Sequence, residues 1–119
     1  MNIEMYSTLA LRTAPLNQSQ WSNLIHAALG AGGESGEIED HVKKVAFNGR
    51  PLDRDHLIEE VGDVMWYLNL LVSELGTTWG HVLSVNISKL KARYPDMKFD
   101  AERSLNRDLD AEKAAMGFV

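Results

Sequence analysis

Residues 34–37 read Glu-Ser-Gly-Glu, and residues 60–63 read Glu-Val-Gly-Asp. In each stretch two acidic residues lie three positions apart, which places both side chains on one face of a helix. Apolar residues recur around both stretches at intervals of three and four, the period of an amphipathic helix. Two helices joined by a short connection pack as antiparallel neighbours. The sequence therefore predicts a helical hairpin in which four carboxylates converge on the groove between the helices, namely Glu34, Glu37, Glu60 and Asp63.

Helix signals extend outward from this hairpin along the rest of the chain. The expected helices cover residues 3–13, 20–47, 54–75 and 79–93, and no stretch shows the apolar–polar alternation of a strand. The last three helices have typical N-caps and stop residues: Ser19, Asp53 and Thr78 before them, and Gly49 and Gly76 after the first two. Residues 108–119 are expected to form a C-terminal tail or a short helix. The pattern is that of an all-α protein.

The second expected helix contains an unusual cluster of glycines, at Gly30, Gly32, Gly33 and Gly36. Each glycine costs roughly 0.5–1 kcal/mol relative to alanine inside a helix. One interpretation is a break or kink that gives two shorter helices. The other is a continuous helix that is thin enough for another backbone or a ligand to approach closely, and both stay open. The inward stripe of this segment is expected at Leu24, Ala28, Ala31, Ser35, Ile38, Val42 and Val45.

Composition restricts the class of protein. The chain has 119 residues, 45% of them hydrophobic, no cysteine and a formal net charge of −5. This length predicts one domain, and the lack of cysteine excludes disulfides and thiolate metal sites. An acidic chain without a concentrated basic face disfavours nucleic-acid binding. Because we find neither a signal peptide nor an apolar run near the ~20 residues of a membrane span, we expect a cytoplasmic protein that does not bind membranes.

Converging carboxylates need a cation, because like charges repel and burying them unpaired costs several kcal/mol each. Hard divalent ions prefer oxygen ligands, so the predicted site suits Mg²⁺, with Mn²⁺ as the alternative. The competing interpretation is that both acidic pairs are solvated helix surface, which is common. A di-iron carboxylate site is disfavoured, since none of the four histidines follows a glutamate by three positions.

Basic and amide side chains lie at helical spacing along the same segments. Lys44 continues the face of Glu37 at seven positions further on. Asn86, Lys89 and Arg93 share one polar face of the fourth expected helix. Such side chains suit phosphate oxygens beside a metal ion, although solvated surface residues would show the same spacing.

The run from Ala27 to Lys44 resembles the first half of the MazG-like nucleotide pyrophosphohydrolases. Residues 49–54, 59–68, 86–90, 93–95 and 104–107 continue this resemblance. It covers roughly residues 5–107, so we take residues 1–107 as the domain and 108–119 as the tail. The resemblance implies a four-helix core bundle that assembles through its helix faces into a homodimer or homotetramer. One departure is Gly33, where many relatives have an acidic residue.

The resemblance also implies a reaction: Mg²⁺-dependent hydrolysis of a nucleoside triphosphate to the monophosphate and pyrophosphate. The family's metal ligands carry over to Glu34, Glu37, Glu60 and Asp63, and its phosphate contacts to Lys44, Asn86, Lys89 and Arg93. Water is expected to attack the α-phosphorus in line while pyrophosphate leaves. Glu37 is the preferred general base, with Glu59 as the second candidate.

The substrate and the biological role are open at this point. Relatives act on canonical, deoxy or damaged nucleotides, and small stand-alone members occur in phages, where they would adjust the dNTP pool. We expect nucleotide-pool control, with a purine deoxynucleotide such as dGTP as the first substrate to test. The alternatives are a dUTPase or phosphoribosyl-ATP pyrophosphohydrolase of the same superfamily, a non-catalytic helical dimer that binds a partner, and a simple divalent-ion-binding bundle.

Overall fold

The computed structural model describes residues 1–15 and 18–118, and all regular structure in these residues is helical. The helices are α1 (Ile3–Leu11), α2 (Gln20–Asn48), α3 (Arg54–Glu74), α4 (Trp79–Arg93), α5 (Ala101–Leu105) and α6 (Leu109–Ala115). The predicted all-α fold is therefore confirmed. The six helices of the described residues fall into two compact units, Met1–Thr77 and Thr78–Val119. None of the described helices combines the length and the apolar character that crossing a membrane requires.

Local capping explains where the long helices begin. The side chain of Ser19 accepts a hydrogen bond from the backbone N–H of Ser22, and Asp53 does the same for His56 at the start of α3. Thr78 caps α4 in the same way. Gly49 ends α2 in the left-handed conformation, with φ of 67°. These predicted boundaries are confirmed, whereas α1 ends two residues earlier than the predicted 3–13, because the chain tightens there into turns closed at Arg12 and Thr13.

Helix α2 runs without interruption through its glycine cluster. The interpretation as two shorter helices is therefore wrong, and the close-approach interpretation describes one of the four glycines. A Cβ added at Gly30 would overlap the ring of Tyr67 on α3, whereas one added at Gly32, Gly33 or Gly36 would meet nothing within 4 Å. The approaching group is thus an aromatic side chain, and Gly30 sets how closely α2 and α3 pack.

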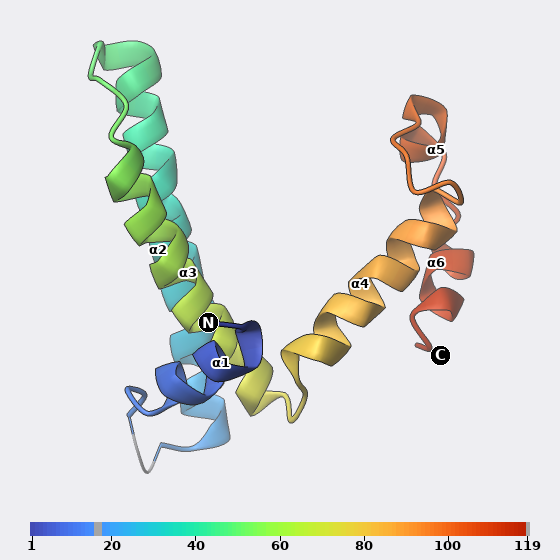
Figure 1. The fold of residues 1–119 in the computed structure, drawn as a ribbon, viewed down its shortest axis with the longest axis horizontal. Helices are drawn as coiled ribbons and strands as arrows, with labels where there is room; N and C mark the ends of the chain where they lie inside the picture. The colour runs from blue at the N-terminus through green and yellow to red at the C-terminus, as the bar shows by residue number, and fades with distance from the viewer. Residues whose placement is uncertain (16–17, 119) are drawn as a thin grey trace. The chain divides into compact units, whose positions relative to one another are not determined.

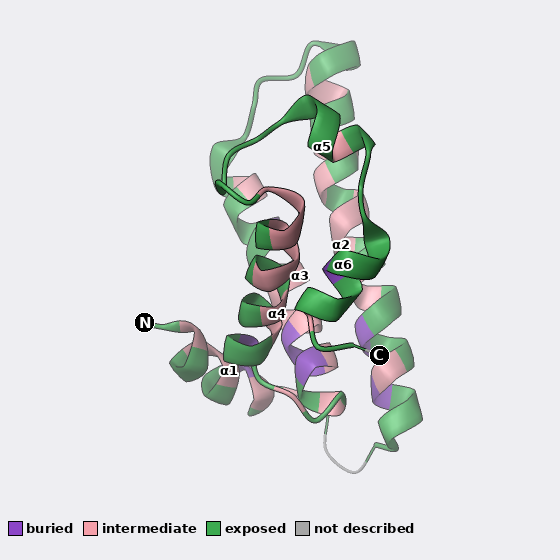
Figure 2. Ribbon diagram, turned by 90° about the vertical axis from the view of Figure 1, so that its right-hand side faces the viewer, coloured by how far each residue is buried: buried purple, intermediate pink, exposed green. Residues whose placement is uncertain are grey.

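The first unit is built on the antiparallel pair α2 and α3, which lie side by side along their length, with α1 packed against α3 (Figure 1). Hydrogen bonds join α3 to the α1 region, among them one from Trp66 Nε1 to Thr13 Oγ1 at 2.8 Å and one from Asn69 Nδ2 to the carbonyl of Ser7 at 3.2 Å. Apart from one glutamate described below, the buried positions of this unit gather at the α1 end of the pair (Figure 2), at Ala10, Asn23, Ala27, Asn69, Leu70 and Val72.

This burial corrects the stripe predicted for α2. Ala27 is fully buried and Asn23 is 9% exposed, whereas the predicted inward residues Ala28 and Val42 lie on the exposed surface. The other five predicted positions are half-buried, so the stripe is confirmed in part. The buried positions lie beside it because α3 packs along the line of Gly30.

The second unit joins α4 to α6 through one buried acidic residue. Glu112 on α6 is 3% exposed and forms ion pairs with Arg93 at 2.7 Å and Arg107 at 2.6 Å. The short-helix alternative for the end of the chain is what the structure shows over Leu109–Ala115. The proposed division of the chain between residues 107 and 108 stays a prediction.

Candidate metal centre

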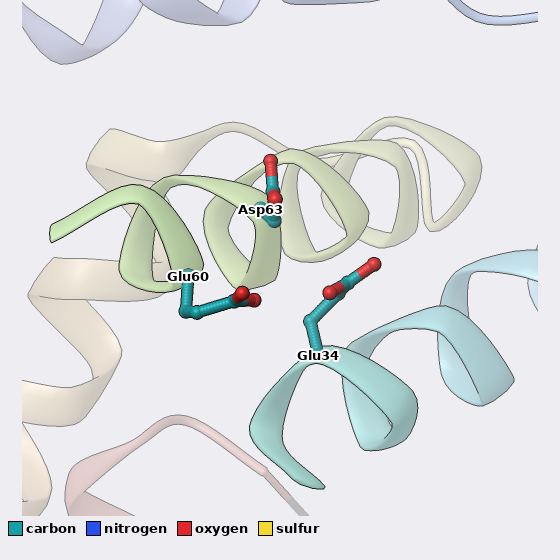
Figure 3. Close-up of side chains that lie close together, drawn as sticks. All are labelled: Glu34, Glu60 and Asp63. Atoms are coloured by element: carbon teal, nitrogen blue, oxygen red, sulfur yellow. The ribbon is translucent and has the colours of Figure 1, made fainter. Parts of the chain in front are cut away.

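Three of the predicted carboxylates meet between α2 and α3. Glu34 reaches from α2 toward Glu60 and Asp63 on α3 (Figure 3), and one carboxylate oxygen from each residue lies within 4.8 Å of the other two. Glu60 is 8% exposed, Glu34 is half-buried and Asp63 is exposed. The i, i+3 spacing on α3 thus presents one carboxylate from inside the groove and one from its rim, with the third facing them from α2.

The electrostatics of this cluster are unbalanced. The Oε2 atom of Glu60 is buried and has no hydrogen-bond partner, while its Oε1 lies 3.5 Å from Nδ1 of His56. Partial burial, followed by the negative charges of Asp63 and Glu60 and a hydrogen bond to Glu60, raises the pKa of Glu34 above its ordinary value of 4.5. A buried oxygen without a partner and a carboxylate whose ionisation is opposed by neighbouring negative charges both indicate a missing positive charge.

A hard divalent cation fits this arrangement. Carboxylate oxygens are the ligands that Mg²⁺ prefers, and it retains several waters when a protein supplies few ligands. The partnerless Oε2 of Glu60 supplies a buried ligand atom, and Asp63 at the rim leaves one side of the cluster open to water and substrate. The described residues therefore match the donor set and the open geometry of a magnesium or manganese site.

Two further predicted acidic residues lie outside this group of three. Glu37 is exposed one turn further along α2, and its charge makes the smallest of the contributions that raise the pKa of Glu34. Glu59 is exposed on α3 beside Glu60. The structure therefore brings Glu34, Glu60 and Asp63 together and leaves the other two available to solvent.

Lys44 lies on α2 as predicted and already has a partner. Its Nζ forms an ion pair with Oδ2 of Asp40, and this pair lowers the pKa of the Asp40 carboxyl. Asp40 was not among the predicted site residues, and the contact between His56 and Glu60 was not predicted either. Both are i, i+4 pairs on a helix, so their spacing was the signal that would have found them.

The basic face predicted on α4 lies in the second unit. Asn86 is exposed and Lys89 is half-buried. Arg93 donates from Nε to Oε1 of Glu112 at 2.7 Å, and this contact raises the pKa of the arginine. Arg107 binds the same carboxylate through two nitrogens. The sequence analysis missed Glu112, because no local spacing connects residues that are 19 positions apart.

Gly33, the residue before the first motif glutamate, is the position at which the sequence departs from the pattern of the family that it resembles. A Cβ at Gly33 would meet nothing within 4 Å, so the first unit has room for a larger side chain there. Packing within the unit does not explain the glycine.

Comparison with known proteins gives a family match and a relative in a phage. The model of the MazG nucleotide pyrophosphohydrolase domain matches residues 25–98, which include both acidic motifs. The Gene 37 protein of Mycobacterium phage L5 is 32% identical over 101 residues, covering 78% of this chain and 89% of that protein. No solved structure gives a significant match. With a family match across most of the chain and the two acidic motifs facing each other, the chain belongs to the MazG nucleotide pyrophosphohydrolase domain family.

Proposed function

We propose that this protein is a Mg²⁺-dependent enzyme that hydrolyses a (d)NTP to the (d)NMP and pyrophosphate, cutting between the α- and β-phosphates. The observation that carries this proposal is the group of three carboxylates with a buried, partnerless oxygen on Glu60. A helix surface evolved only for solubility would leave such an oxygen in water. Membership of the MazG family gives the reaction class.

The side chains divide the work as follows. Glu34, Glu60 and Asp63 hold the ion, with Glu37 as a fourth ligand from the next turn of α2. Mg²⁺, when bound, neutralises charge on the phosphates and lowers the pKa of water in the site. Glu37 accepts the proton of the attacking water, since it is exposed beside the cluster. Glu59 is the second candidate for this role.

Contacts to the phosphates are assigned to Lys44, Asn86, Lys89 and Arg93. Lys44 lies on the same helix as Glu34 and Glu37, and its ion pair with Asp40 holds its ammonium group in place. Arg93 binds Glu112 through Nε and one terminal nitrogen, so its other terminal nitrogen is the one to offer to a phosphate. Nucleotide-pool control is the role we propose, and dGTP leads the substrates to be tested.

Assembly through helix faces is part of the proposal. Large apolar side chains are exposed along the two long helices of the first unit, on α2 at Trp21, Ile25 and Leu29 and on α3 at Ile58 and Val61. Exposed apolar surface of this extent is typical of a protein interface. A homodimer or homotetramer would cover it. The net charge of −5 supports a nucleotide rather than a nucleic acid as the ligand.

Incubation with a panel of ribo- and deoxynucleoside triphosphates, with and without Mg²⁺, tests the proposal. The panel includes dUTP, phosphoribosyl-ATP and common damaged nucleotides, because a dUTPase and a phosphoribosyl-ATP pyrophosphohydrolase are the enzymatic alternatives. Monophosphate plus pyrophosphate, lost in Glu60→Ala and kept in Glu102→Ala, is the expected result. Glu102 is a matched control because it is an exposed glutamate on α5.

Each other outcome favours a different conclusion. Diphosphate plus inorganic phosphate would contradict cleavage at the α-phosphorus. Metal binding without turnover of any triphosphate would favour a divalent-ion-binding bundle. If the protein showed no metal binding and no turnover, the result would favour the non-catalytic helical dimer.

A further inference from the structure

A cavity of about 450 Å³ lies at the connection end of the α2–α3 pair. It is lined by side chains on one face of α2 from Glu37 to Lys44, by the connection at Arg50, Pro51 and Asp53, and by His56 on the first turn of α3. All of these residues belong to the first unit. Glu37 and Lys44 have proposed roles above, whereas the other residues of this lining have none.

The cavity continues directly from the carboxylate group. On α2, Glu37 lies one helical turn beyond Glu34 and lines the cavity. On α3, Nδ1 of His56 lies 3.5 Å from Oε1 of Glu60. A ligand whose reacting atom lies at the carboxylates therefore has its next groups within reach of this cavity.

The acidic side chains of the lining are already engaged within the protein. Asp40 is paired with Lys44 and, at 3.3 Å, with Lys43. Asp53 accepts a hydrogen bond from the backbone N–H of His56 at 3.0 Å, which caps α3. Its own N–H donates to Nε2 of His41 at 3.0 Å. A neutral His41 that accepts at Nε2 carries its proton on Nδ1, so this ring offers one donor.

Arg50 is different from the other cations of the lining. Its backbone N–H is held by the carbonyl of Lys44 at 3.3 Å, directly after the left-handed turn at Gly49. Its side chain is exposed and, among the described residues, takes part in no ion pair. A guanidinium group without a carboxylate partner, fixed by its backbone at the mouth of a cavity, is suited to bidentate binding of a phosphate.

We propose that this cavity binds the β- and γ-phosphates of the substrate, and pyrophosphate as the product, with Arg50 as their anchor. The inference rests on the proposed function and extends it by naming where the leaving group lies. If Glu37 serves the ion, the remaining formal charges of the lining cancel, two acidic against two basic. The cavity therefore accepts the magnesium complex of pyrophosphate rather than the bare anion. Such a site would also select for triphosphates, because a diphosphate substrate would leave part of the cavity empty.

Isothermal titration of the purified full chain with inorganic pyrophosphate in the presence of Mg²⁺ tests this inference. Arg50→Ala is expected to weaken binding by about tenfold or more, the range for loss of a charge-assisted phosphate contact. Arg54→Ala is the matched control, since Arg54 lies four residues further on, pairs weakly with Asp55 at 3.8 Å and does not line the cavity. Its affinity for pyrophosphate is expected to stay within about twofold of the unmodified chain. Affinity for dGMP is expected to stay unchanged in both variants.

Three results would overturn the inference. The unmodified chain could fail to bind pyrophosphate with Mg²⁺, or Arg50→Ala could bind it as tightly as Arg54→Ala. In the third, Arg50→Ala would lose dGMP rather than pyrophosphate, and the cavity would then hold the nucleoside. Turnover with Arg50-independent pyrophosphate binding would reject this inference alone. Arg50-dependent pyrophosphate binding without turnover would reject the proposed function alone.

Discussion

Glu60 and Glu112 are both buried carboxylates, 8% and 3% exposed. The side chains around Glu60 are mainly negative, whereas those around Glu112 are positive. Glu112 lies between two arginines, and their hydrogen bonds lower its pKa to about 2. Glu60 lies beside Glu34 and Asp63, and one of its oxygens has no partner. The first carboxylate is neutralised by the chain itself. The second is left for a ligand to neutralise.

This difference separates a structural ion cluster from a candidate functional one. Removing one partner of a buried ion pair is strongly destabilising, because the other charge is left unpaired. Removing one charge from a cluster of like charges has the opposite sign, because the remaining charges then repel less. The two clusters should therefore respond in opposite ways to substitution, to pH and to divalent ions.

The largest effect is expected on turnover from Asp63→Asn. This change keeps the shape of an exposed side chain and removes one of the charges that would hold the ion. We expect kcat with saturating Mg²⁺ to fall at least about 100-fold. The unfolding temperature in chelator should not fall, since no partner is lost. Turnover near that of the unmodified enzyme would place the ion elsewhere.

The next largest effect is expected on stability from Glu112→Ala. This change leaves Arg93 and Arg107 facing each other without their shared partner. We expect the unfolding temperature, measured by calorimetry, to fall by more than about 5 °C. Glu102→Ala, at an exposed position, is the control and should change it by less than about 1 °C. Equal unfolding temperatures for the two variants would contradict a structural role for Glu112.

A third comparison concerns how the carboxylates of the candidate site are held together. Gly30 lies one turn before Glu34, and Tyr67 one turn after Asp63, so their contact sets the separation of α2 and α3 at the cluster. Gly30→Ala should destabilise the protein by about 1–3 kcal/mol through overpacking. Gly32→Ala, where the added Cβ meets no neighbour, should stabilise it by roughly 0.5–1 kcal/mol. Denaturant titration measures both, and a shared sign would contradict this account of the glycines.

The smallest expected effect is on the pH dependence of stability, which should have opposite signs for Glu34 and Glu112. The raised pKa of Glu34 means that its contribution to folding in chelator is greatest below pH 4.5 and is lost as the pH rises through the folded-state pKa. Glu34→Gln should therefore raise the unfolding temperature at pH 7 in chelator. The gain should vanish on acidification toward pH 4.

The lowered pKa of Glu112 has the opposite sign. Its contribution to folding is complete above pH 4.5 and is lost as the pH falls toward its folded-state pKa of about 2. In thermal scans across this pH range, the unfolding temperature of the unmodified chain should fall toward that of Glu112→Ala. If the unfolding temperatures of the two proteins changed with pH in parallel, the lowered pKa of Glu112 would be contradicted.

The sequence predicted the elements whose causes are local. Ser19, Asp53 and Thr78 each cap a helix through their own side chain, so the starts of α2, α3 and α4 followed from residue type. The i, i+3 spacing of Glu60 and Asp63 predicted that they share a face, because helix geometry alone fixes it.

The buried face of α2 and the membership of the carboxylate group depend on how α2 and α3 are oriented about their axes. Spacing within one helix does not determine this orientation. Packing of Tyr67 on Gly30 turned the buried line of α2 toward Ala27, and Glu34 entered the group of three while Glu37 stayed outside it. The link between Arg93 and Glu112 spans a loop and a short helix, and no periodic pattern connects them.

The central claim is that the chain leaves Glu34, Glu60 and Asp63 for a divalent cation to neutralise. Electron paramagnetic resonance of free Mn²⁺, titrated with the purified protein, measures this directly. We expect saturable Mn²⁺ binding that Mg²⁺ displaces, that Glu60→Gln weakens by at least about tenfold, and that Glu102→Gln leaves unchanged. Absence of saturable binding, or equal affinity in Glu60→Gln and the unmodified chain, would contradict the account.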